Sequence, residues 1–292
     1  MEDHRWGGSL IRTETAPMTL RLDQQKSEER RRALDQYLTA NVLATEFICT
    51  HYQECKSSHA ARFYEGQLHH VGRFYDLLFD GLPLRIVIVG QEYGHAPAPV
   101  NSQARYNMIM SSGLECRFKA EGNFEARNPH MRGTSNVLRL LFNVPLGTDH
   151  KSEFMKIDGG CVHLFDAFAL VNYLLCSAVG NDGKTRGLAT PTMMKNCQHH
   201  FRGALQILEP SVIVVQGKRI WPWVRSTFDS ITHQASEVHA AKLGSIQTFV
   251  ASFTHPSARY PYNWGTNDRT PYLLQTVRPS IEWIRDKIFN SR

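Results

Sequence analysis

A cluster of residues that could do chemistry follows an apolar stretch near the start of the chain. The segment LRIVIVG ends at Gly90. Five polar or turn-forming residues come directly after it: Gln91, Glu92, Tyr93, Gly94 and His95. A run of Leu, Ile and Val closed by glycine is typical of a buried parallel strand, and open α/β folds place their sites at the carboxyl ends of such strands. A carboxylate at this edge can position water or accept a proton.

A second apolar stretch also ends in reactive residue types. Residues 246–253, IQTFVASF, lead into Thr254-His255-Pro256-Ser257. An imidazole such as His255 can donate a hydrogen bond to an oxygen that gains negative charge. Each block closes a predicted strand, and the pair in this order is more specific than either block alone.

The two blocks together resemble motifs A and B of the uracil-DNA glycosylase superfamily. Motif A is Gly-Gln-Asp-Pro-Tyr-His in family 1 and Gly-Glu-Ala-Pro-Gly in family 4, and motif B is an apolar strand running into His-Pro-Ser. The resemblance covers roughly residues 84–260. It implies a DNA glycosylase that hydrolyses the N-glycosidic bond of uracil or a 5-modified pyrimidine and leaves an abasic site. The target base must first leave the helix and enter a pocket.

The resemblance implies catalytic and DNA-binding roles for single residues. Glu92 stands where family 1 has its catalytic Asp and would activate water. His255 would donate to the carbonyl oxygen of the departing base. Ser257 resembles the phosphate-binding Ser of motif B, and Arg259 and Tyr260 lie in the loop that enters the minor groove.

The resemblance also implies base-binding residues. Asn172 ends the stretch FALVN and resembles the Asn that reads the Watson–Crick edge, because a buried amide offers both a donor and an acceptor. Asp166, which follows the apolar VHLF, is the alternative; Cys176, four residues after Asn172, favours Asn172. Gln91 would contact the base, as would His130, which occupies the place of the stacking Phe of family 4.

The choice of base depends on the fifth position of motif A. Family 1 has a Tyr there that blocks the 5-methyl group of thymine, and this chain has Gly94. The pocket could therefore admit hydroxymethyluracil or a bulkier modified cytosine of the kind phages carry, unless Tyr93 or His95 fills the space. Repair of plain uracil and defence against modified phage DNA both stay open. A catalytically silent member that binds DNA or damaged bases is the alternative function.

The resemblance extends to the cysteines and implies a metal centre. Family 4 enzymes hold a [4Fe–4S] cluster with two Cys before motif A and two after the Asn strand, and four thiolates are the usual ligands. The resemblance implies that the ligands here are Cys49, Cys55, Cys176 and Cys197. Free thiols are the other reading, and His199-His200 beside Cys197 leaves zinc open. The remaining cysteines, Cys116 and Cys161, are expected to have no part in it.

The elements that must position these residues alternate along the chain. Apolar runs predict strands at 84–90, 162–172, 211–217 and 246–253, and helical spacing predicts helices at 26–56, 59–80, 133–142, 190–208, 219–229 and 271–289. Residues 91–130 read as a long loop. This alternation predicts a three-layer α/β/α fold with a mostly parallel, four-stranded sheet. We expect residues 1–25 to form a flexible arm and residues 26–292 one domain with a helical extension at 26–80.

Net charge and the length of the apolar runs indicate which kinds of partner the chain could bind. The 292 residues are 42% hydrophobic, carry a net charge of +6 and have a pI near 9.0. A basic protein suits a polyanionic partner such as DNA without requiring one. No apolar run reaches the roughly 20 residues that span a bilayer, and MEDHRWGGSL lacks an apolar signal core. The sequence therefore predicts a cytoplasmic protein with no membrane partner, and it leaves the oligomeric state open.

Overall fold

Four apolar segments form the parallel centre of the main sheet. They are β6 (Ile86–Gly90), β11 (Ala169–Asn172), β13 (Val212–Gln216) and β16 (Ile246–Phe253), in the spatial order β11-β6-β13-β16. Nearly all their residues are buried, as expected for strands covered on both faces. The computed structural model describes residues 20–66, 68–93, 100–114, 118–119, 123–124, 128–146, 153–180, 188–266 and 268–289.

Three antiparallel strands extend this centre to seven strands. β3 (His70–Val71) pairs with β11 at one edge, and the hairpin β14 (Ser230–Ala235) and β15 (Val238–Leu243) joins β16 at the other. The four predicted strands are thus present and adjacent, but the sheet is larger than the four strands expected. The hairpin is half exposed and mixes polar with apolar residues, so it lacks the apolar run that marks the central strands.

The remaining strands form small sheets around the main one. β1 (Leu20–Leu22), β4 (Leu77–Phe79) and β5 (Leu82–Leu84) make a three-stranded sheet. Three two-stranded pairs complete the set: β2 (Arg62–Tyr64) with β12 (Ser177–Val179), β9 (Phe154–Ile157) with β10 (Gly160–His163), and β7 (Phe118–Lys119) with β8 (Asn123–Phe124). β1 and the start of the helix that begins at Gln24 fall within residues 1–25, the stretch that was expected to be a flexible arm.

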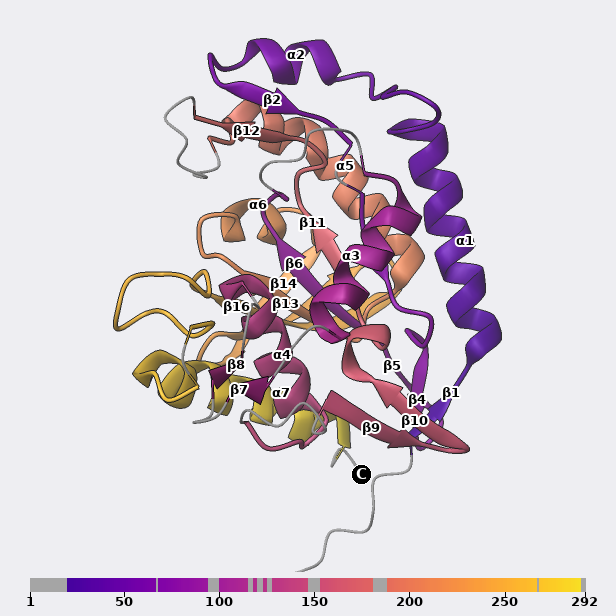
Figure 1. Ribbon diagram of the computed structural model, residues 1–292, viewed down its shortest axis with the longest axis vertical. Helices are drawn as coiled ribbons and strands as arrows, with labels where there is room; N and C mark the ends of the chain where they lie inside the picture. Colours follow the sequence, from indigo (N-terminus) through magenta and orange to yellow (C-terminus); the bar gives the residue numbers. More distant parts are fainter. Residues whose placement is uncertain are drawn as a thin grey trace, which may run out of the picture.

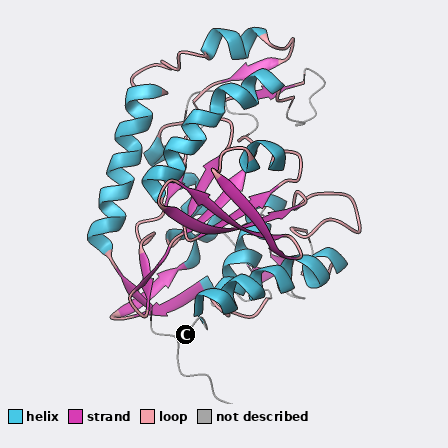
Figure 2. Cartoon of the chain, turned by 180° about the vertical axis from the view of Figure 1, so that it is seen from behind, coloured by secondary structure: helices cyan, strands magenta, loops and turns pink. Residues whose placement is uncertain are grey.

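Helices cover both faces of the sheet, which confirms an α/β fold. α1 (Gln24–Asn41), α2 (Tyr52–Ser57), α5 (Pro191–Leu208) and α6 (Trp221–Arg225) share a core with Val87 and Val89 of β6. α4 (Pro129–Leu141) and α7 (Arg278–Phe289), which follows a π-helical turn at Leu273–Val277, share another with Ile86 and Ile88. Figures 1 and 2 show the two helical layers from opposite sides. No helix in the described ranges is long and apolar enough to cross a membrane.

The N-terminal third departs from the predicted helices. The helix expected at 59–80 is wrong, because this stretch forms β2, β3 and β4, which find partners in β12, β11 and β1. Its apolar residues are spaced like a helix but are buried by strand pairing with distant segments. The helix expected at 26–56 is two helices, α1 and α2. A helix, α3 (Ser102–Leu114), occupies part of the predicted loop 91–130.

Two boundaries near the site also differ from expectation. The predicted strand 162–172 is interrupted by a 3-10 turn at Leu164–Asp166, so β11 begins only at Ala169. α4 begins at Pro129 rather than at residue 133. Asn128 caps it by accepting a hydrogen bond from the Met131 backbone N–H at 2.9 Å, with proline at the first helical turn. This earlier start places His130 in the helix.

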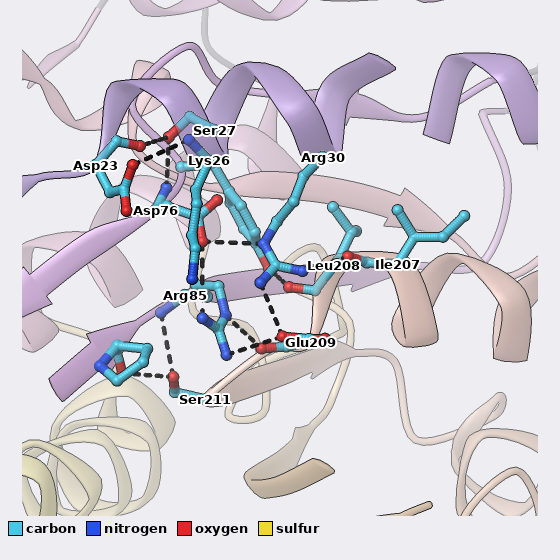
Figure 3. A network of polar contacts seen from close by, with 12 residues as sticks. Asp23, Lys26, Ser27, Arg30, Asp76, Arg85, Ile207, Leu208, Glu209 and Ser211 are labelled. Atoms are coloured by element: carbon cyan, nitrogen blue, oxygen red, sulfur yellow. Dashed lines mark hydrogen bonds and ion pairs between the residues drawn. The ribbon is translucent and has the colours of Figure 1, made fainter. Parts of the chain in front are cut away.

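A buried polar network fixes α1 to the rest of the fold (Figure 3). Arg30 donates to Asp76 at 2.9 Å, to Glu209 at 2.8 Å and to the Ile207 carbonyl at 2.5 Å. Arg85 donates to the Glu209 carbonyl. Asp76 follows β3 and Glu209 ends α5, so one guanidinium joins three segments that are far apart in sequence. The N-terminal helix is therefore part of the domain core.

Candidate active site at the carboxyl edge of the sheet

The ends of β6 and β11 bring two of the predicted segments together. Asn172 is the register partner of Gly90, and past the strands the Leu174 N–H donates to the Gln91 carbonyl at 2.8 Å. A Cβ added to Gly90 would stand 3.1 Å from His130 Cε1 and 3.2 Å from Asn172 Oδ1. The Gly90 backbone thus lies directly against the His130 ring and the Asn172 amide, and only glycine leaves them this space.

Asn172 presents a hydrogen-bond donor that has no partner in the described part of the chain. The residue is 3% exposed, and its Nδ2 atom is buried without an acceptor. Buried amide donors are nearly always satisfied because leaving one unpaired costs free energy. An unsatisfied amide at a strand end is therefore well suited to bind a ligand that supplies the acceptor.

Asp166, the alternative to Asn172, lies elsewhere. It precedes β11 and so sits beyond the amino end of that strand. Its carboxylate accepts from the Arg73 backbone N–H and from Arg73 Nε, both at 2.7 Å, and is 2% exposed. These contacts hold Asp166 in an internal ion pair with Arg73. Asn172, the last residue of β11, is the one of the two that lies at the carboxyl edge of the sheet.

Glu92 holds a partly buried carboxylate beside the strand ends. Its Oε1 accepts from Gln91 Nε2 at 2.7 Å, and its Oε2 accepts from the Ala178 backbone N–H at 3.3 Å. Burial raises the pKa of Glu92 above its usual 4.5, although the Gln91 and Ala178 hydrogen bonds and the charge of Arg219 act in the opposite direction. A carboxylate with a raised pKa is a better proton acceptor than a solvent-exposed one.

His255 is held by hydrogen bonds to Ser257, two residues later in the chain. Its Nδ1 lies 2.8 Å from Ser257 Oγ and accepts from the Ser257 backbone N–H at 3.2 Å. Because Nδ1 is an acceptor in the second contact, the ring proton of the neutral imidazole is on Nε2. Desolvation of the ring lowers the pKa of His255 below 6.5. The residue is thus a neutral imidazole with an N–H available for a ligand.

His130 is a second neutral imidazole at the same place. The Gln216 amide, in the orientation that satisfies both of its atoms, has its nitrogen 2.6 Å from His130 Nδ1 and its oxygen 3.0 Å from Thr134 Oγ1. His130 Nδ1 then accepts, and Nε2 carries the proton. Burial, with the nearby His255 and Arg105, lowers the pKa of His130 to about 3. This residue can therefore donate a hydrogen bond from Nε2 to a ligand.

Close packing between α4 and the motif B loop brings the two histidines together. A Cβ on Gly133 would stand 2.7 Å from Pro256, and one on Gly265 would stand 2.0 Å from the Pro129 carbonyl oxygen. The Trp264 and Gly265 N–H groups donate to the Pro256 carbonyl, and Asn136 donates to the Trp264 carbonyl. Glycine at these contacts lets the loop approach the helix closely.

The other predicted site residues are exposed like His255 itself, partly exposed, or outside the described residues. Arg259 and Tyr260 are exposed on the loop after His255, with Tyr260 76% exposed. The Tyr93 ring lies under the Arg105 guanidinium, 4.6 Å from it. Gly94 and His95 fall outside the described residues.

The four predicted ligand cysteines gather in one region. Cys55, Cys176 and Cys197 are buried, and Cys49 is partly buried. Burial raises the pKa of Cys176 first of all, and Cys197, Cys49 and Cys55 raise it further by charge repulsion, which requires that the thiols be near one another. Cys49 Sγ also lies 3.6 Å from His200 Nε2, while Cys161 is exposed on β10 and Cys116 is outside the described residues.

These cysteines equal in number the four thiolates that usually hold a [4Fe–4S] cluster. Among the described residues, no group of three or more His, Cys, Asp or Glu side chains stands close enough to hold a metal ion. One tetrahedral ion would need its sulfur ligands about 3.8 Å apart, given Zn–S bonds of about 2.3 Å. In a [4Fe–4S] cluster each thiolate binds a different iron, so the thiols lie further apart. A [4Fe–4S] cluster on these four cysteines therefore stays a prediction.

Sequence analysis missed three polar residues of the site. Gln216 ends the apolar run SVIVVQ, so its position was a signal of the same kind that identified Asn172. Arg219 acts on Glu92 from the segment after β13. Arg105 lies on α3, which was predicted to be loop, and nothing in its sequence neighbourhood marks it.

Comparison with known proteins identifies no family for the chain. No family model matches it, and no curated protein sequence matches it. Evidence about function comes from the residues at the carboxyl edge of the sheet, above all Asn172, Glu92 and His255.

Proposed function

We propose that the protein is a DNA glycosylase of the uracil-DNA glycosylase superfamily that removes uracil or a 5-modified pyrimidine and leaves an abasic site. The buried, unpartnered Nδ2 of Asn172, at the same sheet edge as Glu92, is the observation that carries the proposal. Motifs A and B, each following a central strand of the sheet, support it.

Asn172 and His130 account for recognition of the base. A pyrimidine with a 4-oxo group presents an acceptor at O4 and a donor at N3. Asn172 Nδ2 donates to the first, and its Oδ1 accepts from the second. His130, whose Nε2 points toward Gly90, adds a donor or a stacking surface.

Glu92 and His255 account for cleavage. The bond between the sugar C1′ and the base N1 breaks, and its electron pair goes to the base, where it is shared with O2. His255 Nε2–H donates a hydrogen bond to that oxygen. Glu92 orients a water that adds to C1′ and accepts its proton. The carboxylate also offsets the positive charge on the sugar.

DNA would bind along the exposed loop after β16. Ser257, Arg259 and Tyr260 all lie on it, and the net charge of +6 favours a polyanion. Affinity should fall steeply as salt rises, because bound phosphates release counterions.

A [4Fe–4S] cluster held by Cys49, Cys55, Cys176 and Cys197 is part of the proposal. Hydrolysis needs no electron transfer, so the cluster would stabilise the fold. Cys176 follows Asn172 by four residues, which puts such a cluster next to the segment that presents the base-reading amide.

Base release from defined oligonucleotides tests the proposal. Duplexes and single strands carrying uracil, hydroxymethyluracil or a bulkier modified cytosine would be incubated with protein, and abasic sites cleaved with alkali and resolved on a gel. Release of at least one of these bases, slowed about 100- to 1,000-fold in Glu92→Gln and in His255→Ala, is expected. Exposed Glu29→Gln and His233→Ala serve as matched controls. Release at wild-type rates by both site variants would refute the assignment.

A protein that binds damaged DNA without cutting it is the second candidate. One observation favours it: both oxygens of Glu92 already accept hydrogen bonds from the protein, which restricts their orientation toward a water. This candidate predicts tight, salt-sensitive binding to DNA that carries the modified base, with no abasic site formed.

A further inference from the structure

Arg105 is a buried cation at the candidate site. It lies in the first turns of α3 and is 5% exposed. Its guanidinium lies over the ring of Tyr93, the residue that follows Glu92. Its guanidinium carbon is 4.6 Å from the centre of the Tyr93 ring. An aromatic face attracts a cation but does not neutralise its charge.

The guanidinium has no anionic partner in the described part of the chain. Its Nε is buried without an acceptor, and no carboxylate of those residues pairs with it. Buried charges are almost always paired, because removal from water is costly.

The charge of Arg105 acts on the histidines around it. It contributes to the lowered pKa values of His69 and His70 on the β3 side and of His130 on α4, each about 3, although burial is the larger cause. Burial also lowers the pKa of Arg105 itself, to about 10, which leaves it charged at neutral pH. The surrounding imidazoles are neutral, so Arg105 supplies positive charge that they do not.

We propose that Arg105 is an electrostatic catalytic group that stabilises the negative charge developing on the departing base. The inference rests on the proposed function. Arg105 is buried beside Tyr93, and its charge acts on His130, so a base in contact with His130 would lie within its field. DNA phosphates would instead meet the exposed loop that carries Arg259. A fixed, buried charge acts strongly on an anion that appears only as the bond breaks.

No proton moves in this step. The C1′–N1 bond breaks, its electron pair passes to N1 and O2 of the base, and the guanidinium stays protonated throughout. The contribution of Arg105 should therefore grow with the negative charge that the leaving base must carry. A base that stabilises its own anion needs Arg105 less.

Leaving-group dependence tests this role. Release of uracil and of the more acidic 5-fluorouracil would be measured over a range of DNA concentrations, to give kcat and KM, in one strand context for wild type, Arg105→Met and Arg105→Lys. We expect Arg105→Met to slow uracil release about 100-fold or more, and 5-fluorouracil release clearly less, mainly through kcat. Arg105→Lys should retain the wild-type ratio between the bases. Arg31→Met, which removes a cation from the Tyr106 ring 5.5 Å away outside the site, is the matched control.

Several outcomes would overturn the role. Equal slowing of both bases, or a change in KM alone, would show that Arg105 only shapes the pocket. Thermal melting shows whether Arg105→Met folds. If it does not, a changed ratio of uracil to 5-fluorouracil release rates in Arg105→Lys would overturn the role instead. Failure of wild type to release any base would instead reject the proposed function. In DNA-free protein, imidazole NMR titration should also show a higher pKa for His130 in Arg105→Met; an unchanged value would contradict the electrostatic contact.

Discussion

The imidazole rings of His130 and His255 lie nearly parallel, with centroids 6.1 Å apart and an angle of 21° between their planes. One ring comes from α4 and the other from the loop after β16, more than a hundred residues later. Each has Nδ1 occupied by a partner, which places its proton on Nε2. The candidate site therefore offers two neutral N–H donors side by side.

The pH dependence of base release should show one acidic limb. Glu92 must be ionised to accept a proton, and its pKa is raised, so activity should fall as pH drops through a value above 4.5. His255 is already neutral well above its lowered pKa, so activity should stay level as pH rises through 6.5. Initial rates under saturating DNA from pH 4.5 to 8.5 measure this. A decline above pH 6.5 would indicate a protonated His255 instead.

Gly90→Ala should impair the site more than the fold. The new methyl group would meet His130 Cε1 at 3.1 Å and Asn172 Oδ1 at 3.2 Å, so both must shift by a few tenths of an ångström. Base release should fall at least tenfold with a modest decrease in melting temperature. Gly160→Ala, where a Cβ meets no atom within 4 Å, is the control and should keep its activity. Wild-type kinetics in Gly90→Ala would contradict the placement of both residues.

Cys176→Ser should remove bound iron. If the four thiols hold a [4Fe–4S] cluster, anaerobically purified protein should be brown, absorb near 400 nm and contain about four irons per chain. Cys176→Ser should lose most of the iron and colour, and exposed Cys161→Ser should lose neither. A colourless, iron-free wild type prepared anaerobically would reject the iron–sulfur cluster. Bound zinc in its place would support a zinc site that includes His200, whose Nε2 lies beside Cys49 Sγ.

Arg30→Met should destabilise the protein strongly. The change leaves Asp76, 3% exposed, with only the longer 3.6 Å contact to Arg85 (Figure 3). Removing one partner of a buried pair costs about 3 kcal/mol. Chemical denaturation should show this loss, while Arg32→Met, which breaks an exposed 3.8 Å pair with Glu28, should change little. Equal stability of the two variants would mean that the network does not hold α1 in place.

Sequence patterns predicted the parts of the fold that depend on long apolar runs. β16 was expected at 246–253 and found there, and α5 begins within one residue of its predicted start. The helix expected at 59–80 failed because pairing with β11 and β1 decides that stretch, and such partners are distant in sequence. The hairpin β14–β15 and α3 were missed because neither has a strong apolar pattern.

The candidate site was predicted where it follows a strand end. Glu92, Asn172 and His255 all come after or at the end of a central strand, so the sheet brings their segments to one edge. His130 was expected from resemblance, but its contact with Gln216 could not be foreseen, since it depends on the packing of α4 against β13. Arg105 acts from a helix whose position the sequence does not define.

The contact between α4 and the motif B loop limits how this protein can be altered by engineering. Gly133 faces Pro256 and Gly265 faces the Pro129 carbonyl, with no room for a methyl group in either place. A loop transplanted from another protein would bring its own side chains to this contact. Residues 128–136 and 254–265 would therefore have to be exchanged as one unit, and libraries that randomise either segment alone should yield mostly inactive variants.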